Sequence, residues 1–378
     1  MAMKVAILGA GNVALATACY LATAGRDVHL WSAFAHERQA LGDGVLTAEG
    51  MVGGRSRITV CDEVGACVAG APLVVIAAPA FGHETLMAAA APHLGSDQDV
   101  LIHPVTGLSS LLLSRMMAAR RETPTIIDAS TSLFTARKTG PRSVRVLKIK
   151  DVIDLAAIPA SRGPQALARL EGIFGKRFRL EPNALADSLN NHNPVYHVAP
   201  VLCNLSRAEK QENWIFWECI TPGVARLVEL VDDERLRVAR HFGTTEIPVA
   251  DYFRQAHGAV GADLPEIFAS MAATLKGPIG PQSFEHRFVT EDVPFALVFY
   301  HALGRAVGIP MPVTRNLIEL TSALYGRDFV EEGHTLEKLG LAGLSAREIL
   351  QRTIDGFSPE RPVEDSREVI GTEHRTLA

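Results

Sequence analysis

Two short polar segments in the second half of the sequence combine residue types that could transfer protons and bind an anion. The first is NNHNPVYH at residues 190–197. Asn193 followed by Pro194 is a favourable N-cap and first-turn pair, which predicts a helix beginning at Pro194 with His197 one turn in, on the same side as Asn193. An imidazole titrates near neutral pH and can serve as a general acid or base. The alternative is a capped helix with a hydrogen-bonded structural histidine.

The second segment is HRFVTEDVP at residues 286–294, with one arginine and two carboxylates. Thr290 is a natural N-cap, which places Asp292 in the first turn of a helix, where the helix dipole favours its ionised form. Arg287 lies five residues before Asp292, in the extended chain that leads into the helix, and offers a planar fork for a substrate carboxylate. The alternative is ordinary helix-start chemistry.

The spacing of histidines and cysteines argues against a bound metal. His192 and His197 are five residues apart, which separates them by about 140° on a helix, and the sequence has no HExxH motif. The five cysteines are odd in number and form no CxxC pair, which favours free thiols in a reducing compartment. The sequence therefore predicts no metal site and a cytoplasmic protein.

The amino-terminal residues have the pattern of a nucleotide-binding unit. A strand, a helix and a second strand are expected in close succession, at residues 3–8, 12–24 and 28–31. In the turn between the first two, Gly9 permits the tight bend, Gly11 lets the backbone approach a pyrophosphate, and Ala14 lets the helix pack closely on the strand. Asn12 opens the helix whose free N–H groups would face the phosphates. The alternative is a buried Ala/Gly-rich hairpin without a ligand.

The end of the second predicted strand bears on the choice of cofactor. NAD enzymes usually carry a carboxylate there, which binds the ribose 2′-OH. The sequence has Ser32 at this point and Arg38 soon after, whereas Glu37 lies several residues beyond the strand. A hydroxyl with a nearby cation suits a 2′-phosphate, so the sequence favours NADP over NAD. The alternative leaves Arg38 as an ordinary exposed helix residue.

The elements that would position these residues indicate an α/β protein: an N-terminal Rossmann domain with a doubly wound parallel sheet, then a mostly α-helical C-terminal domain. Further short strands are predicted at 57–61, 73–78, 100–103, 125–127, 144–149 and 155–158. Pro79 and Pro104 follow two of these strands and put turns at the carboxyl edge of the sheet. The nicotinamide is expected there, which makes Pro79 a candidate cofactor-binding residue.

Long helical patterns replace the short strands from about residue 183. They cover 222–242, 264–276, 291–307 and 314–325. The predicted divisions are an NAD(P)-binding domain at 1–182, a catalytic and substrate domain at 183–356, and a polar tail at 357–378 that could strap onto the domain or a partner subunit.

The overall composition is that of a soluble globular protein. The 378 residues suit two domains, and 47% are hydrophobic and 21% charged. A net charge of −5 gives no basic footprint for nucleic acid or an anionic membrane. Glycines interrupt the apolar amino terminus, unlike a signal peptide, and the longest other apolar stretch, around 71–81, is too short to span a bilayer. The expected partners are small molecules, and a homodimer is possible.

Several of these segments together resemble the signatures of the opine dehydrogenase family. They are VAILGAGNVA at 5–14, NPVYH at 193–197, DER at 233–235 and RFVTEDV at 287–293. The resemblance extends from Met3 to about Gly356. It implies an enzyme that condenses the amine of an amino acid with a 2-oxo acid, such as pyruvate or 2-oxoglutarate, and reduces the imine with hydride from NAD(P)H. The small-molecule partners would then be an amino acid and a 2-oxo acid.

The resemblance also implies roles for individual residues. His197 would be the general acid/base, and Asp292 would orient it and stabilise its charge, by the logic of the histidine–aspartate part of a catalytic triad. Arg287 would bind a substrate carboxylate, and Asn193 would help to set the site.

Two other functions stay open. A related two-domain dehydrogenase would reduce a 2-oxo acid directly to a hydroxy acid with no amine partner. A non-catalytic dinucleotide-binding sensor would need the glycine turn, but not the histidine, arginine and aspartate together. The loop HPVTG at 103–107 is less glycine-rich than expected for the family, and His192 is a second departure. The sequence therefore names neither the amino acid nor the 2-oxo acid.

Overall fold

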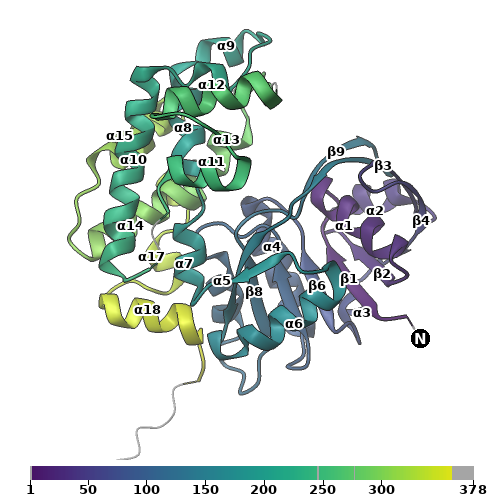
Figure 1. Ribbon diagram of the computed structural model, residues 1–378. Helices are drawn as coiled ribbons and strands as arrows, with labels where there is room; N and C mark the ends of the chain where they lie inside the picture. Colours follow the sequence, from purple (N-terminus) through teal and green to yellow (C-terminus); the bar gives the residue numbers. More distant parts are fainter. Residues whose placement is uncertain (1, 245–246, 276, 360–378) are drawn as a thin grey trace, which may run out of the picture.

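The computed structural model describes residues 2–244, 247–275 and 277–359, which form two lobes side by side (Figure 1). The first lobe is a layered α/β domain, and the second is built of helices. Two predictions fall partly outside this range. Lys276, the last residue of one predicted helix, lies outside the described residues, and so does the predicted tail beyond residue 359.

The chain begins with the predicted strand–turn–helix–strand unit. Strand β1 (Lys4–Leu8) is an apolar run with almost no exposure, and helix α1 (Asn12–Thr23) follows after three residues. Gly25 stands just past the helix with φ +75°, a left-handed conformation that glycine adopts without steric cost. Strand β2 (Asp27–Trp31) then pairs in parallel with β1. The sequence prediction is confirmed here to within a residue.

Within the described residues, eight strands form the central sheet in the order β12-β11-β8-β7-β6-β1-β2-β5. The strands not yet given are β5 (Thr59–Val60), β6 (Leu73–Ile76), β7 (Asp99–Ile102), β8 (Thr125–Ala129), β11 (Ile153–Ile158) and β12 (Phe178–Leu180). Each neighbouring pair is parallel except β8 and β11. The predicted doubly wound parallel sheet is therefore confirmed, except that β11 and β12 at one edge run antiparallel to the other strands.

The strand order reverses at β1. The chain first builds outward through β2 and β5, then returns to pair β6 on the other side of β1 and continues to β7 and β8. In such sheets the ligand binds in the crevice outside the carboxyl ends of the strands at the reversal. Here those ends are Leu8 of β1 and Ile76 of β6.

A second, four-stranded sheet was not predicted as such. Its order is β4-β3-β10-β9, with bounds β3 (Val45–Gly50), β4 (Gly54–Arg57), β9 (Phe134–Gly140) and β10 (Ser143–Ile149). The predicted strand at 57–61 is wrong as one element, because Arg57 ends β4 in this sheet and Thr59 begins β5 in the other. Strands β9 and β10 form a hairpin that packs on α1.

Helices cover both faces of the central sheet. Besides α1, they are α2 (Ala35–Leu41), α3 (Val64–Val68), α4 (Ala80–Ala90), η1 (Ala91–His93), α5 (Ser109–Met116), η2 (Ala160–Arg162) and α6 (Gly163–Phe174). One hydrophobic core fills the face covered by α1, α6 and the second sheet. The other core lies beneath α3, α4 and α5 and continues without interruption into the helical lobe. The shared core gives the two lobes a fixed contact on that side.

The helical lobe carries the segments that the sequence marked for chemistry. Its elements are α7 (Ala184–Leu189), α8 (Asn193–Cys203), α9 (Leu205–Glu209), η3 (Trp217–Cys219), α10 (Pro222–His241), α11 (Val249–His257), α12 (Leu264–Leu275), α13 (Arg287–Thr290), η4 (Val293–Leu297), α14 (Val298–Ala306), α15 (Pro312–Tyr325), α16 (Phe329–Glu332), α17 (Leu336–Leu339) and α18 (Ala346–Asp355). The long predicted helices are present, and η4 with α14 makes up the one predicted at 291–307.

The last helix returns to the first lobe. Helix α18 begins at a capping box between Ser345 and Glu348 and packs on β11 and η2 of the α/β domain. Just after it, the Phe357 backbone N–H donates to Ser114 Oγ at 2.8 Å. The predicted second domain, residues 183–356, therefore ends in a helix that packs against the α/β domain.

Candidate active site

The two polar segments predicted from the sequence meet in the helical lobe. His197, in the second turn of α8, has its Nδ1 2.7 Å from Asp292 Oδ2, and both side chains are buried. The His197 Nε2 has no hydrogen-bond partner in the described part of the chain. A histidine held through Nδ1 by a carboxylate keeps one tautomer, which leaves Nε2 for a substrate.

Aromatic rings fix the plane of the imidazole. Phe288 stacks on His197 with ring centroids 3.6 Å apart and an interplanar angle of 13°. Tyr196 and Phe216 pack at its other sides, with centroids 4.4 and 5.9 Å away. The ring can therefore move little, as proton transfer at a fixed point requires.

Burial governs the charge of the His197–Asp292 pair. It lowers the pKa of the His197 imidazole and raises the pKa of Asp292 to about 7, because both charged forms lose hydration. The positive charge of Arg287 acts on the same pair and lowers both pKa values. With one proton the pair is anionic and Nε2 can accept a proton, whereas with two protons it is uncharged and Nε2 can donate. Burial thus favours the uncharged, proton-donating form of the pair.

Arg287 lies near the pair but is exposed to solvent. No hydrogen bond or ion pair engages its guanidinium among the described residues. Two predictions about its surroundings are wrong: Arg287 is the first residue of α13 and not part of an extended lead-in, and Thr290 ends that helix and caps nothing. Asp292 consequently stands just before η4. The short helix forms because His286 Nδ1 accepts from the Phe288 N–H and caps it.

Asn193 lies at the start of α8, but it is not the N-cap that the sequence predicted. The N-cap is His192, and Asn193 is the first helical residue. Its backbone N–H donates to Asn191 Oδ1 at 3.1 Å, and its Oδ1 accepts from the Tyr196 hydroxyl at 3.4 Å. The side chain therefore orients a ring that packs against His197.

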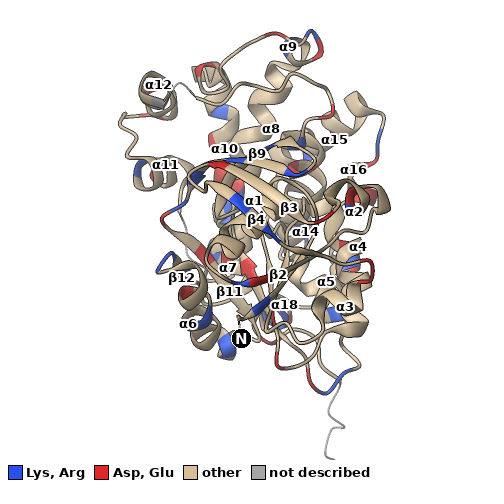
Figure 2. Ribbon diagram, turned by 90° about the vertical axis from the view of Figure 1, so that its right-hand side faces the viewer, with Lys and Arg blue, Asp and Glu red and all other residues tan. Residues whose placement is uncertain are grey.

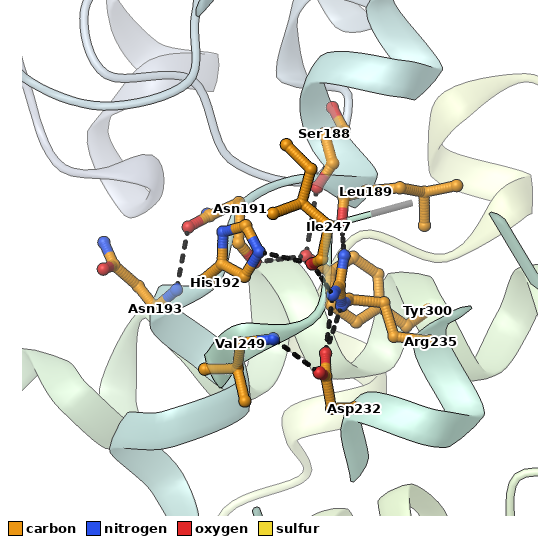
Figure 3. A network of polar contacts seen from close by, with 10 residues as sticks. All are labelled: Ser188, Leu189, Asn191, His192, Asn193, Asp232, Arg235, Ile247, Val249 and Tyr300. Carbon is orange, nitrogen blue, oxygen red and sulfur yellow. Dashed lines mark hydrogen bonds and ion pairs between the residues drawn. The ribbon is translucent and has the colours of Figure 1, made fainter. Parts of the chain in front are cut away.

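A buried polar network holds the start of α8 in place (Figure 3). Arg235, fully buried on α10, donates to both the Leu189 and Ile247 carbonyls and is ion-paired with Asp232. His192 shares the Ile247 carbonyl through its Nε2 at 2.7 Å. A buried arginine needs this full set of acceptors. Arg235 of the DER segment thus fastens the chain that leads into α8, the helix that carries His197.

The middle residue of that segment does a second structural task. Glu234 accepts from the backbone N–H groups of Val313 and Thr314, and from the Thr314 hydroxyl at 2.7 Å. It thereby caps the first turn of α15 from another helix.

Sequence reasoning missed one residue that connects the two lobes. The Ala80 N–H, at the start of α4 and directly after Pro79, donates to Glu291 Oε1 at 3.0 Å. Glu291 is buried and precedes Asp292, so the segment that carries Asp292 is tied to the turn that follows β6. The sequence signal was present as a carboxylate beside Asp292, but only the fold brings it to a helix start 211 residues earlier.

The predicted glycine turn has the shape that a dinucleotide requires. Gly9 has φ +123°, and a Cβ there would lie 2.5 Å from the Ala77 carbonyl oxygen, so no other residue fits. A Cβ on Gly11 would meet nothing within 4 Å, which leaves open space beside the first turn of α1. Ala14 is fully buried beneath the turn. No side chain in the described chain caps this helix, so its first N–H groups can bind phosphate oxygens.

The arrangement at the end of β2 differs from the prediction. Ser32 Oγ donates to the carboxylate of Glu37, and Arg38 Nη1 donates to the Ser32 carbonyl at 2.6 Å. The inference that no carboxylate lies at this strand end is therefore wrong, because helix α2 turns Glu37 back onto Ser32. Both a carboxylate and a guanidinium stand where the adenosine ribose is expected.

The remaining predicted residues are placed as follows. Pro79 follows β6 and is the N-cap of α4, across the strand-order reversal from the glycine turn. Asn12 Oδ1 accepts from the Lys138 N–H at 2.7 Å, so this side chain contacts β9. Among residues 2–244, 247–275 and 277–359, no three His, Cys, Asp or Glu side chains gather where they could hold a metal ion. None of the helices described there is both long and apolar enough to cross a bilayer.

The fold and the site define a two-domain NAD(P)-dependent dehydrogenase, and comparison with known proteins gives the family. A family model described as NAD/NADP octopine/nopaline dehydrogenase, alpha-helical domain, matches residues 180–325. The opine dehydrogenase of Arthrobacter sp. (strain 1C) is 34% identical over 348 residues, covering 90% of this chain and 96% of that protein. The protein ocs of Agrobacterium tumefaciens (strain Ach5) is 24% identical over 361 residues, covering 93% and 99%. The chain belongs to the opine dehydrogenase family.

Solved structures show the same fold. Octopine dehydrogenase with NADH and L-arginine superposes with a TM-score of 0.76 at 20% identity, covering 92% of this chain and 98% of that one. Yersinopine dehydrogenase with NADP+ bound has a TM-score of 0.71 at 16% identity, covering 94% and 98%. The protein is accordingly an NAD(P)-dependent oxidoreductase that acts on CH–NH donors and reductively condenses an amino acid with a 2-oxo acid.

Proposed function

We propose that His197 and Asp292 act together as the acid/base of this reaction, and that Arg287 binds the carboxylate of a substrate. The observation that carries the proposal is the 2.7 Å bond from His197 Nδ1 to Asp292 Oδ2 beside an arginine that has no protein partner in the described residues. A fixed proton donor and an unpaired cation are what an imine-forming reaction between two carboxylic acids needs.

The bound nicotinamide cofactor supplies the hydride. His197 Nε2 donates a proton to the departing hydroxyl as the carbinolamine of the two substrates loses water. In the reverse reaction Nε2 takes that proton back from water. Asp292 holds the Nδ1 proton throughout and stabilises the imidazolium. Arg287 places the substrate carboxylate, and Asn193 sets the Tyr196 ring against the imidazole.

The amino acid and 2-oxo acid are the finer part of the proposal. We propose an amino acid paired with a small 2-oxo acid such as pyruvate or 2-oxoglutarate. Octopine dehydrogenase, a structural neighbour, is described in complexes with L-arginine and with pyruvate. The carboxylate common to all such substrates matches the exposed guanidinium of Arg287.

The test is oxidation of NAD(P)H with pyruvate or 2-oxoglutarate, each measured with and without a panel of amino acids. We expect turnover only when an amine is present, with a secondary amine as product by mass spectrometry. Turnover of the 2-oxo acid alone to a hydroxy acid would support the second candidate, direct 2-oxo acid reduction. Binding of the dinucleotide without any turnover would support a sensor.

The choice between NADPH and NADH is a separate proposal. Ser32 and Arg38 favour NADPH, the preference predicted from the sequence, because a hydroxyl and a cation suit a 2′-phosphate. Glu37 opposes it, because a carboxylate repels that phosphate and suits the ribose 2′-OH. We propose a modest NADPH preference that Glu37 limits. Replacing Glu37 by Gln should raise kcat/KM for NADPH relative to NADH, and Ser32→Asp should reverse the order. An unchanged ratio in Glu37→Gln would contradict this role.

Location and assembly stay predictions. The described cysteines are free thiols, which suits the reducing cytoplasm. A homodimer is one possible assembly, and analytical ultracentrifugation measures the mass in solution that tests it.

A further inference from the structure

Strand β9 lies beside the turn formed by Gly9, Ala10 and Gly11, and it brings Lys138 to that turn. The Lys138 backbone N–H donates to Asn12 Oδ1 at 2.7 Å, and Lys138 Nζ donates to the Ala10 carbonyl at 3.0 Å. Ala10 is the residue between the two glycines of the turn. Figure 2 shows basic positions along β9, and this strand packs on α1. The ammonium group therefore lies at the dinucleotide turn, although it is 128 residues away in the sequence.

The contacts of Lys138 leave most of its hydrogen-bonding capacity unused. An ammonium group has three N–H donors, and the Ala10 carbonyl accepts from one. No carboxylate pairs with Lys138 in the described residues, and its side chain is exposed. The open space beside Gly11 lies at the same turn. A cation with free donors is thus available at the place where the turn leaves room for a ligand.

We propose that Lys138 binds the pyrophosphate of the nicotinamide dinucleotide, with Asn12 holding β9 in the position that this contact requires. The inference rests on the use of NAD(P) by this enzyme. It adds a residue from the second sheet to a site otherwise made of the glycine turn and α1. In a protein with a net charge of −5, a local cation adds a favourable charge-assisted contact to the N–H groups of the turn that face a doubly charged pyrophosphate. Asn12 then acts as a positioning residue.

The first experiment compares ligands with and without the pyrophosphate. We expect Lys138→Met to weaken ADP-ribose binding by roughly 10- to 200-fold, the scale for losing a charge-assisted hydrogen bond, and to leave adenosine binding unchanged. The salt dependence of ADP-ribose binding should become shallower. Isothermal titration calorimetry measures both ligands. Equal weakening of adenosine and ADP-ribose, or no weakening of either, would overturn the proposal.

Lys4 provides a matched control. Its Nζ donates to the carbonyls of Ala66 and Ala69 at 3.1 and 2.8 Å, at the opposite end of β1 from the glycine turn. Lys4→Met removes the same charge and the same kind of backbone contact. It should leave ADP-ribose binding within twofold of the unmutated protein. A loss equal to that of Lys138→Met would show that net charge, and not position, determines binding, and would overturn the proposal.

A second variant separates the charge from support of β9. Lys138→Gln keeps a neutral donor for the Ala10 carbonyl and should fold normally, yet it should still lose most of the ADP-ribose affinity. Lys138→Arg should retain much of it. At saturating NAD(P)H the kcat of Lys138→Gln should stay within about threefold, with the loss appearing in the KM for the cofactor. Because ADP-ribose binding is measured without substrates, this test does not depend on which reaction the enzyme performs. Full affinity in Lys138→Gln would refute the assignment.

Discussion

His197 and Arg287 belong to the same site but are held in opposite ways. The imidazole is buried, stacked on Phe288 and bonded to Asp292, so its position is set before any substrate arrives. The guanidinium of Arg287 is exposed and has no hydrogen-bond partner in the described chain. Proton transfer depends on a fixed geometry, whereas anion binding depends on a cation not already neutralised by the protein.

The largest expected effect comes from removing the fixed group. Loss of a positioned acid/base costs about 10²- to 10⁴-fold in rate, so His197→Ala should lower kcat by that factor while ADP-ribose still binds. Asp292→Asn should be similarly impaired. Steady-state kinetics of both single variants and the double variant measure this.

The double variant tests whether the two residues form one unit. If they do, combining His197→Ala with Asp292→Asn should cost little more than the worse single change, because the second change removes nothing further. Multiplicative losses would show that the residues act separately and would contradict the pair.

The next largest effect should come from Arg287. A charge-assisted hydrogen bond contributes about 1.5–3 kcal/mol, so Arg287→Ala should lower kcat/KM by roughly 10- to 200-fold. Arg287→Lys should recover only part, because lysine lacks the planar fork. Each substrate is then compared with its carboxylate amidated. If Arg287 binds the carboxylate of one substrate, amidation of that substrate removes the contact in advance. Arg287→Ala should then lower kcat/KM much less with that amide than with the free acid. An equal cost with every substrate would indicate a structural role.

The pH dependence of kcat/KM tests how Arg287 acts on the His197–Asp292 pair. Oxidation of the product needs the pair with one proton, so kcat/KM in that direction should fall as the pH drops below the pKa of the pair, which burial raises by disfavouring its anionic form. Condensation needs the second proton and should fall as the pH rises above the same value. Arg287 lowers this pKa, so Arg287→Gln should move both limbs to higher pH. Limbs that stay in place would show that the arginine does not influence the pair.

The smallest expected effect concerns the tie between the lobes. Glu291→Gln weakens the cap on the Ala80 N–H, and losing a helix cap costs about 0.5–2 kcal/mol. The melting temperature should fall by a few degrees and kcat/KM by several-fold, because the turn after β6 loses its fixed distance from Asp292. Glu285→Gln, at an exposed glutamate paired with Arg327, is the control and should change neither value.

The fold was predictable where the determining contacts are close in the sequence. The β1–α1–β2 unit follows from an apolar run, two glycines and an alanine-rich helix within about thirty residues, and the long helices from their periodicity. The short α13 was missed because its cap is a histidine side chain, which is not a typical N-cap residue. The second sheet was not predicted because its strands are exposed on one side. Its two local pairs, β3–β4 and β9–β10, are joined only through β3 and β10, which lie more than ninety residues apart in the sequence.

The candidate site shows the same division. Residue types by themselves pointed to His197, Asp292 and Arg287, because few side chains can transfer protons near neutral pH or bind a carboxylate. Their spacing indicated where helices begin but not which residue is the N-cap of each helix, since neighbouring polar residues compete for the same N–H groups. Glu37 was set aside as too distant, because a distance in sequence does not show where a helix turns a side chain.

The sequence by itself thus determined a dinucleotide turn, a helical second half and the chemical types in the site. Tertiary structure alone decided which of those groups touch. It brought His197 to Asp292 across 95 residues, Lys138 to Ala10 across 128 and Glu291 to Ala80 across 211. Turns and helices form through hydrogen bonds between near neighbours, whereas these three contacts exist only once burial of the shared cores has fixed the relative positions of the elements.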